Sequence, residues 1–224
     1  MMYKLLCLLF ILSQPVFSHD EPIYCQLSDR ITEAFCKDMQ KKYNLHCTAN
    51  SGQFLYNVNS LHLTFTCIKN VSVADGRNII VDAVQDLVKR VNGDPDIRPY
   101  LSHYPFSPKD ICISISFYDP SYKRVPTDFL ALIVNTRNYI YYDKYQENRF
   151  FTVFYETFDI AQGKRDRENR LASILSQIET KKNDKFSSKN KSYIHNSQNN
   201  RYQGEPDQQI IENSLRVLLL NPSS

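Results

Sequence analysis

Apolar and polar residues alternate with a period of two in the middle of the chain, and this pattern predicts β-strands. The alternation is cleanest over Ile111–Phe117 and almost as regular over Leu61–Cys67. Phe129–Val134 is continuously apolar, which is typical of a central strand, and Tyr139–Asp143 follows after a short turn as its hairpin partner. Weaker alternation over residues 45–58 indicates further strand structure at the start of this region.

A second periodicity, with apolar residues three and four positions apart, predicts three helices. They span about Ser28–Tyr43, Ser72–Asn92 and Glu168–Thr180. The first two begin at a serine, whose hydroxyl can accept a free amide of the first helical turn. Gly93 then ends the second helix, as glycine commonly does. The segment Arg149–Gly163 fits either a strand or a helix.

The predicted elements follow one another as helix, strands, helix, strand, hairpin and helix. Hairpins require antiparallel pairing, whereas the helix between strands also permits a parallel pair. We therefore predict an α+β fold with an antiparallel or mixed sheet of about five strands and with helices packed mainly on one face. This single globular domain is expected to span residues 19–180.

The start of the chain, Met1–Ser18, has the pattern of a secretory signal peptide. Lys4 precedes an apolar run from Leu5 to Leu12, and Val16 and Ser18 occupy the −3 and −1 positions of a cleavage site. The run is too short for a transmembrane helix, which needs about 20 apolar residues. We therefore expect an exported protein, periplasmic or secreted, whose mature chain begins near His19 and contains no transmembrane segment.

Export changes how the cysteines are interpreted, because disulfides persist in oxidising compartments. Five cysteines follow the predicted signal peptide, namely Cys25, Cys36, Cys47, Cys67 and Cys112. We predict a disulfide between Cys36 and Cys47, which would join the first helix to the next strand; buried free thiols are the alternative. No spacing typical of a zinc finger is present, so neither a metal site nor another cofactor is predicted.

The periodicity ends at Thr180, and residues 181–206 have the composition of a disordered basic linker. Between Lys181 and Arg201 there are six basic residues and one acidic residue, a charge of +5, against +3 for the whole chain; the remainder therefore carries −2. The basic character thus belongs to the linker, and without a nucleic-acid motif it makes nucleic acid an unexpected partner. Residues 207–220 predict a short C-terminal amphipathic helix that either docks on the domain or binds a partner.

Tyr and Phe residues are concentrated between Asn138 and Phe158. Tyr139 and Tyr141 share one side of the predicted strand and Tyr142 takes the other side, so both faces carry rings. The structural interpretation is that these aromatic side chains pack in the core, because aromatic residues are favoured in strands. The functional interpretation is an aromatic surface, including Tyr139 and Tyr141, for a peptide, a glycan or a partner protein.

The segment Ile97–Asp110 contains three prolines and connects the second helix to the next strand. Proline keeps the residue before it extended, so the structural interpretation is a rigid connector whose Tyr100, Leu101 and Phe106 plug the end of the core. The functional interpretation is that Arg98, His103 and Tyr104 bind a ligand, because rigid loops often carry binding residues.

No nucleophile elbow, zinc-protease motif or phosphate-binding glycine loop occurs in the sequence, and no catalytic residue is predicted. We therefore expect a non-catalytic, exported protein that binds a protein or surface partner outside the cytoplasm, through the aromatic surface or the C-terminal helix. The alternative is an exported hydrolase. Its site would lie near His103, which Cys112 can join as a thiol–imidazole pair, or at the carboxylates of Glu156 and Asp159.

Overall fold

The structure is a computed structural model that describes residues 21–196 and the side chains of residues 21–183. The predicted signal peptide and the predicted C-terminal helix lie outside the described residues. The chain divides into two units, Met1–Asn169 and Arg170–Ser224. None of the helices in the described part is both long enough and apolar enough to cross a membrane.

The first unit is built on one six-stranded sheet whose strands lie side by side in chain order. The strands are β1 (His46–Phe54), β2 (Val58–Ile68), β3 (Ile111–Tyr118), β4 (Leu132–Thr136), β5 (Tyr139–Gln146) and β6 (Arg149–Thr157). β2 and β3 are parallel and every other neighbouring pair is antiparallel. The parallel pair needs a long crossover, which the second helix provides. The α+β prediction is therefore confirmed, with a mixed sheet of six strands instead of about five.

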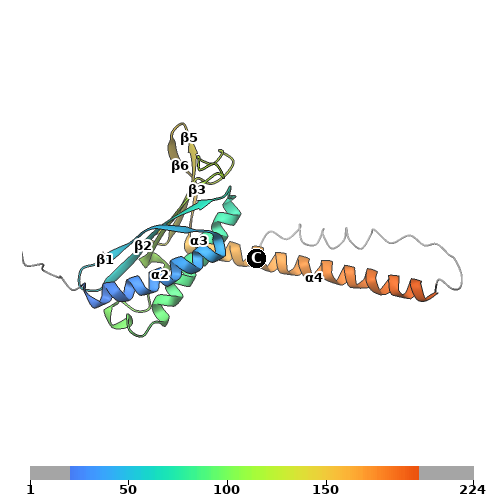
Figure 1. The fold of residues 1–224 in the computed structure, drawn as a ribbon, viewed down its shortest axis with the longest axis horizontal. Helices are drawn as coiled ribbons and strands as arrows, with labels where there is room; N and C mark the ends of the chain where they lie inside the picture. Colours follow the sequence, from blue (N-terminus) through green and yellow to red (C-terminus); the bar gives the residue numbers. More distant parts are fainter. Residues whose placement is uncertain (1–20, 197–224) are drawn as a thin grey trace, which may run out of the picture. The chain divides into compact units, whose positions relative to one another are not determined.

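Two helices, α2 (Ile23–Tyr43) and α3 (Val73–Gly93), lie next to each other and pack against the sheet (Figure 1). α2 contacts β1 and β2, whereas α3 contacts β3 and β4. Alternate residues of β2 and β3 are buried, and the residues between them are half-buried. The core is thus the helix-covered face of the sheet, where Phe35 of α2 meets Phe65 of β2 edge to face. The opposite face of the sheet is called the open face below.

The start of α3 agrees with the sequence prediction. The Ser72 hydroxyl oxygen accepts the amide of Asp75 at 3.1 Å and donates its proton to the Asp75 carboxylate at 2.8 Å. The predicted start of the first helix at Ser28 was wrong, because α2 already begins at Ile23, directly after Pro22. Ser28 is buried inside α2 and its hydroxyl donates to the carbonyl of Tyr24 at 2.7 Å. A serine hydroxyl can cap the start of a helix or donate to a carbonyl inside one. The packing of the helix decides which of the two occurs.

The last described helix, α4 (Phe158–Asn196), resolves the ambiguous segment Arg149–Gly163 into strand β6 followed by helix. α4 includes the predicted helix Glu168–Thr180. It also continues to Asn196, so the structure differs from the prediction of a disordered linker from residue 181 onward. An apolar stripe in a sequence indicates a helix with one buried face. A helix without a buried face has no such stripe, since it needs only backbone hydrogen bonds and residues of adequate helix propensity, such as lysine.

Candidate binding surface on the hairpin of β5 and β6

A tight hairpin joins the last two strands of the sheet. Its two turn residues, Glu147 and Asn148, both have positive φ values, 50° and 60°. Turns with two positive φ angles match the twist of antiparallel strands and therefore favour a two-residue connection. The pairing of Gln146 with Arg149 continues along the hairpin to Tyr139 opposite Thr157.

β6 is the edge strand of the described sheet, since β5 is its only neighbour. Every residue from Arg149 to Tyr155 is exposed. Its exposed large apolar side chains are 36–61% accessible, and together they form what is called the aromatic edge here: Phe150, Phe151, Val153, Phe154 and Tyr155. The opposite edge strand, β1, has no exposed large apolar side chain. The two edges of the sheet therefore differ in chemistry.

Three tyrosines of the hairpin gather on the open face of the sheet, and they are called the tyrosine cluster. The ring of Tyr141 stacks on that of Tyr155, its cross-strand partner, with centroids 5.9 Å apart. The ring of Tyr139 lies 6.4 Å from each of them. No hydrogen bond from the described residues engages the three hydroxyls, so each is free to bind a ligand. The predicted site residues Tyr139 and Tyr141 thus lie together, and Tyr155 joins them.

The remainder of the open face mixes polar residues with half-buried apolar residues. The row that contains Tyr141 continues through Val134, Ser114 and Thr64, which pair in register across β4, β3 and β2. The Ser114 hydroxyl donates a hydrogen bond to the hydroxyl oxygen of Thr64 at 3.2 Å. None of the residues of β2, β3 and β4 is an exposed large apolar side chain, in contrast to the hairpin.

Near the hairpin turn, Arg124 lies against three aromatic rings. Its guanidinium carbon is 4.8 Å from the ring centre of Phe150, 4.9 Å from that of Tyr145 and 5.1 Å from that of Tyr118. Each ring face attracts the cation, and the effect is larger where water is excluded. No carboxylate in the described part of the chain pairs with Arg124, so its charge is available to a ligand at this end of the aromatic edge.

The base of the hairpin is held by a buried carboxylate. Glu156 accepts hydrogen bonds from Arg77 Nε at 2.8 Å, from the Tyr142 hydroxyl at 2.7 Å and from Lys164 Nζ at 2.7 Å. Burial by itself would raise the pKa of Glu156, but the hydrogen bonds from Lys164, Arg77 and Tyr142 outweigh burial and hold the pKa below its ordinary value. Glu156 therefore stays ionised and joins β6 to α3, β5 and α4.

The carboxylate pair predicted for the hydrolase alternative is not assembled. Glu156 lies in β6 with its side chain buried, whereas Asp159 lies in the first turn of α4 and is exposed. The two carboxylates would share one face only if a single helix carried both, and the chain changes from strand to helix between them. With three donors on one carboxylate, Glu156 is an anchor of the fold and has no proton to donate.

The second group of predicted site residues lies in the loop before β3. The guanidinium of Arg98 lies 4.7 Å from the ring centre of Tyr104 and donates to the carbonyl of Asn92 at 3.1 Å. His103 stacks on Phe106 with ring centres 5.9 Å apart. Phe106 and Leu101 are buried in the core, as the structural interpretation of this loop predicted, whereas Tyr100 is only half-buried. The loop is therefore both a core plug and a carrier of exposed polar groups.

His103 stands in a chain of hydrogen bonds with a serine and an aspartate. Its Nε2 lies 2.9 Å from Asp110 Oδ2, and the Ser102 hydroxyl lies 3.1 Å from its Nδ1. A carboxylate only accepts, so the neutral ring carries its proton on Nε2 and accepts from Ser102. The same Asp110 oxygen accepts the amide and the hydroxyl of Ser107, at 2.9 and 2.7 Å. Asp110 thus fixes the loop as well as the imidazole.

The loop and the tyrosine cluster are separate groups. No hydrogen bond, ion pair or ring contact between described residues joins Arg98, His103 or Tyr104 to Tyr139 or Tyr141. Among the described residues, His103 contacts Ser102, Asp110 and Phe106, and Cys112, proposed above as its thiol partner, is not one of them. The thiol–imidazole pair is therefore not formed.

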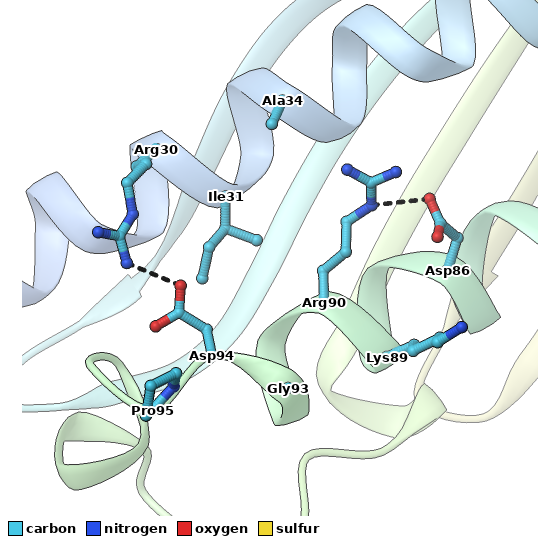
Figure 2. Close-up of a pocket in the computed structure, with 9 residues that line it drawn as sticks. All are labelled: Arg30, Ile31, Ala34, Asp86, Lys89, Arg90, Gly93, Asp94 and Pro95. Carbon is cyan, nitrogen blue, oxygen red and sulfur yellow. Dashed lines mark hydrogen bonds and ion pairs between the residues drawn. The ribbon is translucent and has the colours of Figure 1, made fainter.

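Sequence reasoning missed a groove of about 590 Å³ between α2 and α3 (Figure 2). Figure 2 shows Arg30 paired with Asp94 on one side and Arg90 with Asp86 on the other. These pairs are 2.7 and 2.8 Å long. Because carboxylates already neutralise both arginines, the groove offers an anionic ligand little unpaired charge. The Arg30–Asp94 pair joins α2 to the end of α3, and Arg90 also pairs with Asp38 of α2 at 2.8 Å, so both contacts support the packing of the two helices.

Across the described residues, no three His, Cys, Asp or Glu side chains come together as a metal site. Comparison of the chain with models of protein families, with curated proteins and with solved structures found no match.

Proposed function

We propose that this chain is an exported, non-catalytic protein that binds an extended segment of a partner protein by adding it beside β6 as a further strand. One observation carries the proposal: the aromatic edge is exposed along nearly all of β6, the edge strand of the sheet that the structure describes. Outward-facing amide and carbonyl groups of such a strand hydrogen-bond an added peptide, and adjacent side-chain contacts supply specificity. Export rests on the signal-peptide pattern of Met1–Ser18.

The composition of β6 supports binding, because natural sheet edges are usually protected against it. Charged side chains, proline and strong bulges prevent edge-to-edge pairing. Between Arg149 and Glu156, β6 contains neither a charged residue nor a proline, and all but one of these positions hold Phe, Val or Tyr. β1, at the other edge, is polar and has two irregularities in its pairing with β2, whereas β6 has one in its pairing with β5. An added strand is thus favoured at β6.

The side chains around β6 indicate what the added segment would carry. Alternate residues of the segment would face the tyrosine cluster on the open face, where apolar or aromatic side chains can stack. Near the turn, a carboxylate of the segment would pair with Arg124. The expected ligand is therefore an extended peptide with alternating apolar residues and an acidic residue at the end that lies near the hairpin turn.

The test is selection from a displayed library of random peptides against the purified protein. Enriched peptides should share alternating apolar residues and should lose at least tenfold in affinity for Val153→Lys, which places a charge on the aromatic edge. Leu55→Lys is the matched control, since Leu55 is exposed beyond β1 at the other edge of the sheet. Both variants should melt like the wild type.

Equal binding of the enriched peptides to Val153→Lys, or no enrichment at all, would contradict the proposal. Self-association of the wild type that Val153→Lys abolishes would also contradict it and would make the aromatic edge an interface between two copies of the chain. The export part is tested separately: N-terminal sequencing of the protein recovered from its natural compartment should begin near His19, and an intact Met1 would exclude signal cleavage.

The hydrolase alternative retains one favourable observation, the hydrogen-bonded chain of Ser102, His103 and Asp110. Its order resembles the relay of a serine hydrolase, in which a carboxylate orients the imidazole that activates a hydroxyl. The test is hydrolysis of p-nitrophenyl acetate by the wild type and by His103→Asn. Under the binding proposal both proteins hydrolyse the ester at the same background rate. A rate that falls at least a hundredfold in the variant would favour the hydrolase.

A further inference from the structure

The connection between α2 and β1 brings two cysteines together. α2 ends at Tyr43, Asn44 takes a left-handed conformation with φ 56°, and β1 begins at His46. The chain thus reverses within a few residues, and β1 runs back along the helix. Cys36, about two turns before the end of α2, consequently lies beside Cys47, the second residue of β1.

Cys36 of α2 and Cys47 of β1 are neighbours, and the Cys47 thiol donates to the carbonyl of Ala49 at 3.6 Å. Both cysteines line a surface pocket of about 340 Å³, which His46, Lys37 and Asn50 also line. Cys36 is half-buried and Cys47 is exposed, so a reagent in solvent meets Cys47 first. Burial, followed by the neighbouring Cys47, raises the pKa of the Cys36 thiol. The pair therefore has an accessible thiol and a shielded one.

The other cysteines of the described chain are placed differently. Cys67 is buried and its thiol donates to the carbonyl of Tyr43 at 3.8 Å. Cys112 is half-buried in β3, where it pairs with His62 of β2. Cys25, near the start of α2, has no thiol beside it among the described residues. Cys36 and Cys47 are thus the one thiol pair in the part of the chain that the structure describes.

We propose that Cys36 and Cys47 form an oxidation site that closes to a disulfide by exchange with a small-molecule or protein disulfide, fastening α2 to β1. The Cys47 thiolate attacks one sulfur of the oxidant and expels the other sulfur as a thiol, leaving a mixed disulfide. Cys36 then loses its proton and attacks the Cys47 sulfur, expelling the second thiol. Two protein thiols become one disulfide, and the oxidant disulfide is reduced to two thiols.

The structural consequence is a covalent loop between residues 36 and 47. A short loop constrains the unfolded chain, and this constraint stabilises the folded protein. For a chain of this size the melting temperature of the oxidised protein should rise by roughly 5 °C relative to the reduced protein. An exported protein encounters the oxidising conditions in which such disulfides persist. The inference does not depend on the binding proposal.

The test uses the full-length protein in oxidised and reduced glutathione mixtures, followed by alkylation of free thiols and peptide mapping. Trypsin cuts between the two cysteines at Lys37, Lys41 and Lys42, so a disulfide appears as two linked peptides. The expected product links Cys36 to Cys47. Oxidation that links either of them to Cys25, Cys67 or Cys112 instead would overturn the proposal.

Two single variants test the order of the exchange. Cys36→Ser removes the resolving thiol, so glutathione should remain attached to Cys47. Cys47→Ser removes the accessible thiol, and Cys36 should acquire little glutathione. Cys112→Ser is the control and should form the same linked peptides as the wild type. Failure of Cys36→Ser to retain glutathione, in a protein that still melts cooperatively, would contradict the assignment, as would a wild type in which both thiols stay free.

Discussion

Replacement of Glu156 by glutamine removes the negative charge at the base of the hairpin and keeps nearly the same side-chain volume. In the wild type the carboxylate binds Arg77, which is 8% exposed, together with Tyr142 and Lys164. The amide of glutamine cannot accept three donors or balance the guanidinium charge. The variant therefore leaves Arg77 buried without its main counter-ion.

The expected loss of stability follows from how each partner is placed. Removal of one member of a buried ion pair typically lowers the free energy of unfolding by about 3–5 kcal/mol. Arg77 keeps a second carboxylate, Glu168, at 3.2 Å, and Lys164 is exposed enough to turn toward water. Both effects reduce the loss, so about 3 kcal/mol is expected for Glu156→Gln. Tyr142→Phe removes only one hydrogen bond to the carboxylate and should lower the free energy by about 1.5 kcal/mol.

The assay is urea unfolding at pH 7 followed by circular dichroism, with Asp159→Asn as the matched control. Asp159 is an exposed carboxylate three residues away, and its replacement should change the free energy of unfolding by less than about 0.5 kcal/mol. A Glu156→Gln variant whose urea curve coincides with that of the wild type would refute the reasoning. So would equal losses for Glu156→Gln and Asp159→Asn.

The pH dependence gives a second measure of the same anchor. The pKa of Glu156 is lowered in the folded protein, so the unfolded chain binds the proton more tightly than the folded chain does. The contribution of Glu156 to stability is therefore complete above its unfolded pKa of about 4.3 and is lost as the pH falls through the lower folded pKa. Between pH 7 and about pH 3, Glu156→Gln should lose less stability than the wild type loses.

Two further replacements test contacts that hold the sheet and the hairpin. The fully buried Asn135 donates its amide to the carbonyls of Ile111 at 2.7 Å and Pro108 at 3.2 Å, so Asn135→Ala should lower the free energy of unfolding by about 1–3 kcal/mol in urea; an unchanged midpoint would contradict this role. Arg124→Gln removes the cation from three ring faces and should speed hydrogen exchange in the hairpin about fivefold, equivalent to roughly 1 kcal/mol; equal exchange would show that the rings pack without the cation.

The parts of the fold that were predictable are those in which burial sets the sequence pattern. β3 is buried on one side only, so its residues alternate, and α3 has both an apolar stripe and the Ser72 cap. β6 could not be assigned, because its side chains are exposed on both faces and burial imposes no period on them. The start of α2 was missed for a related reason: Ser28 has the chemistry of a cap but is buried within the helix.

The candidate sites show the same limit. The shared position of Tyr139 and Tyr141 could be predicted, because residues two positions apart in a strand lie on the same face of the sheet. The proximity of Cys36 and Cys47 follows from a short connection between helix and strand. By contrast, Glu156 was paired with Asp159, its neighbour in sequence, whereas its buried partner Arg77 is 79 positions away. Such a partner is fixed by the crossover between β2 and β3, which local spacing does not show.

The two faces of β5 suggest that stability and binding can be separated by neighbouring residues. Tyr142 points to the helix-covered face and donates to Glu156, whereas Tyr141 and Tyr155 lie on the open face with free hydroxyls. Tyr142→Phe should therefore lower the free energy of unfolding and leave the affinity for selected peptides unchanged at temperatures where the variant is folded. Tyr155→Ser should leave the free energy of unfolding nearly unchanged and lower the affinity for the peptides about tenfold, because an exposed ring contributes more to a contact made on binding than to folding.

Titration of the same peptide against both variants, together with their urea curves, measures the two effects. If both variants lose stability and affinity in equal proportion, the tyrosine cluster is only a support of the hairpin and peptide binding must use the backbone edge alone.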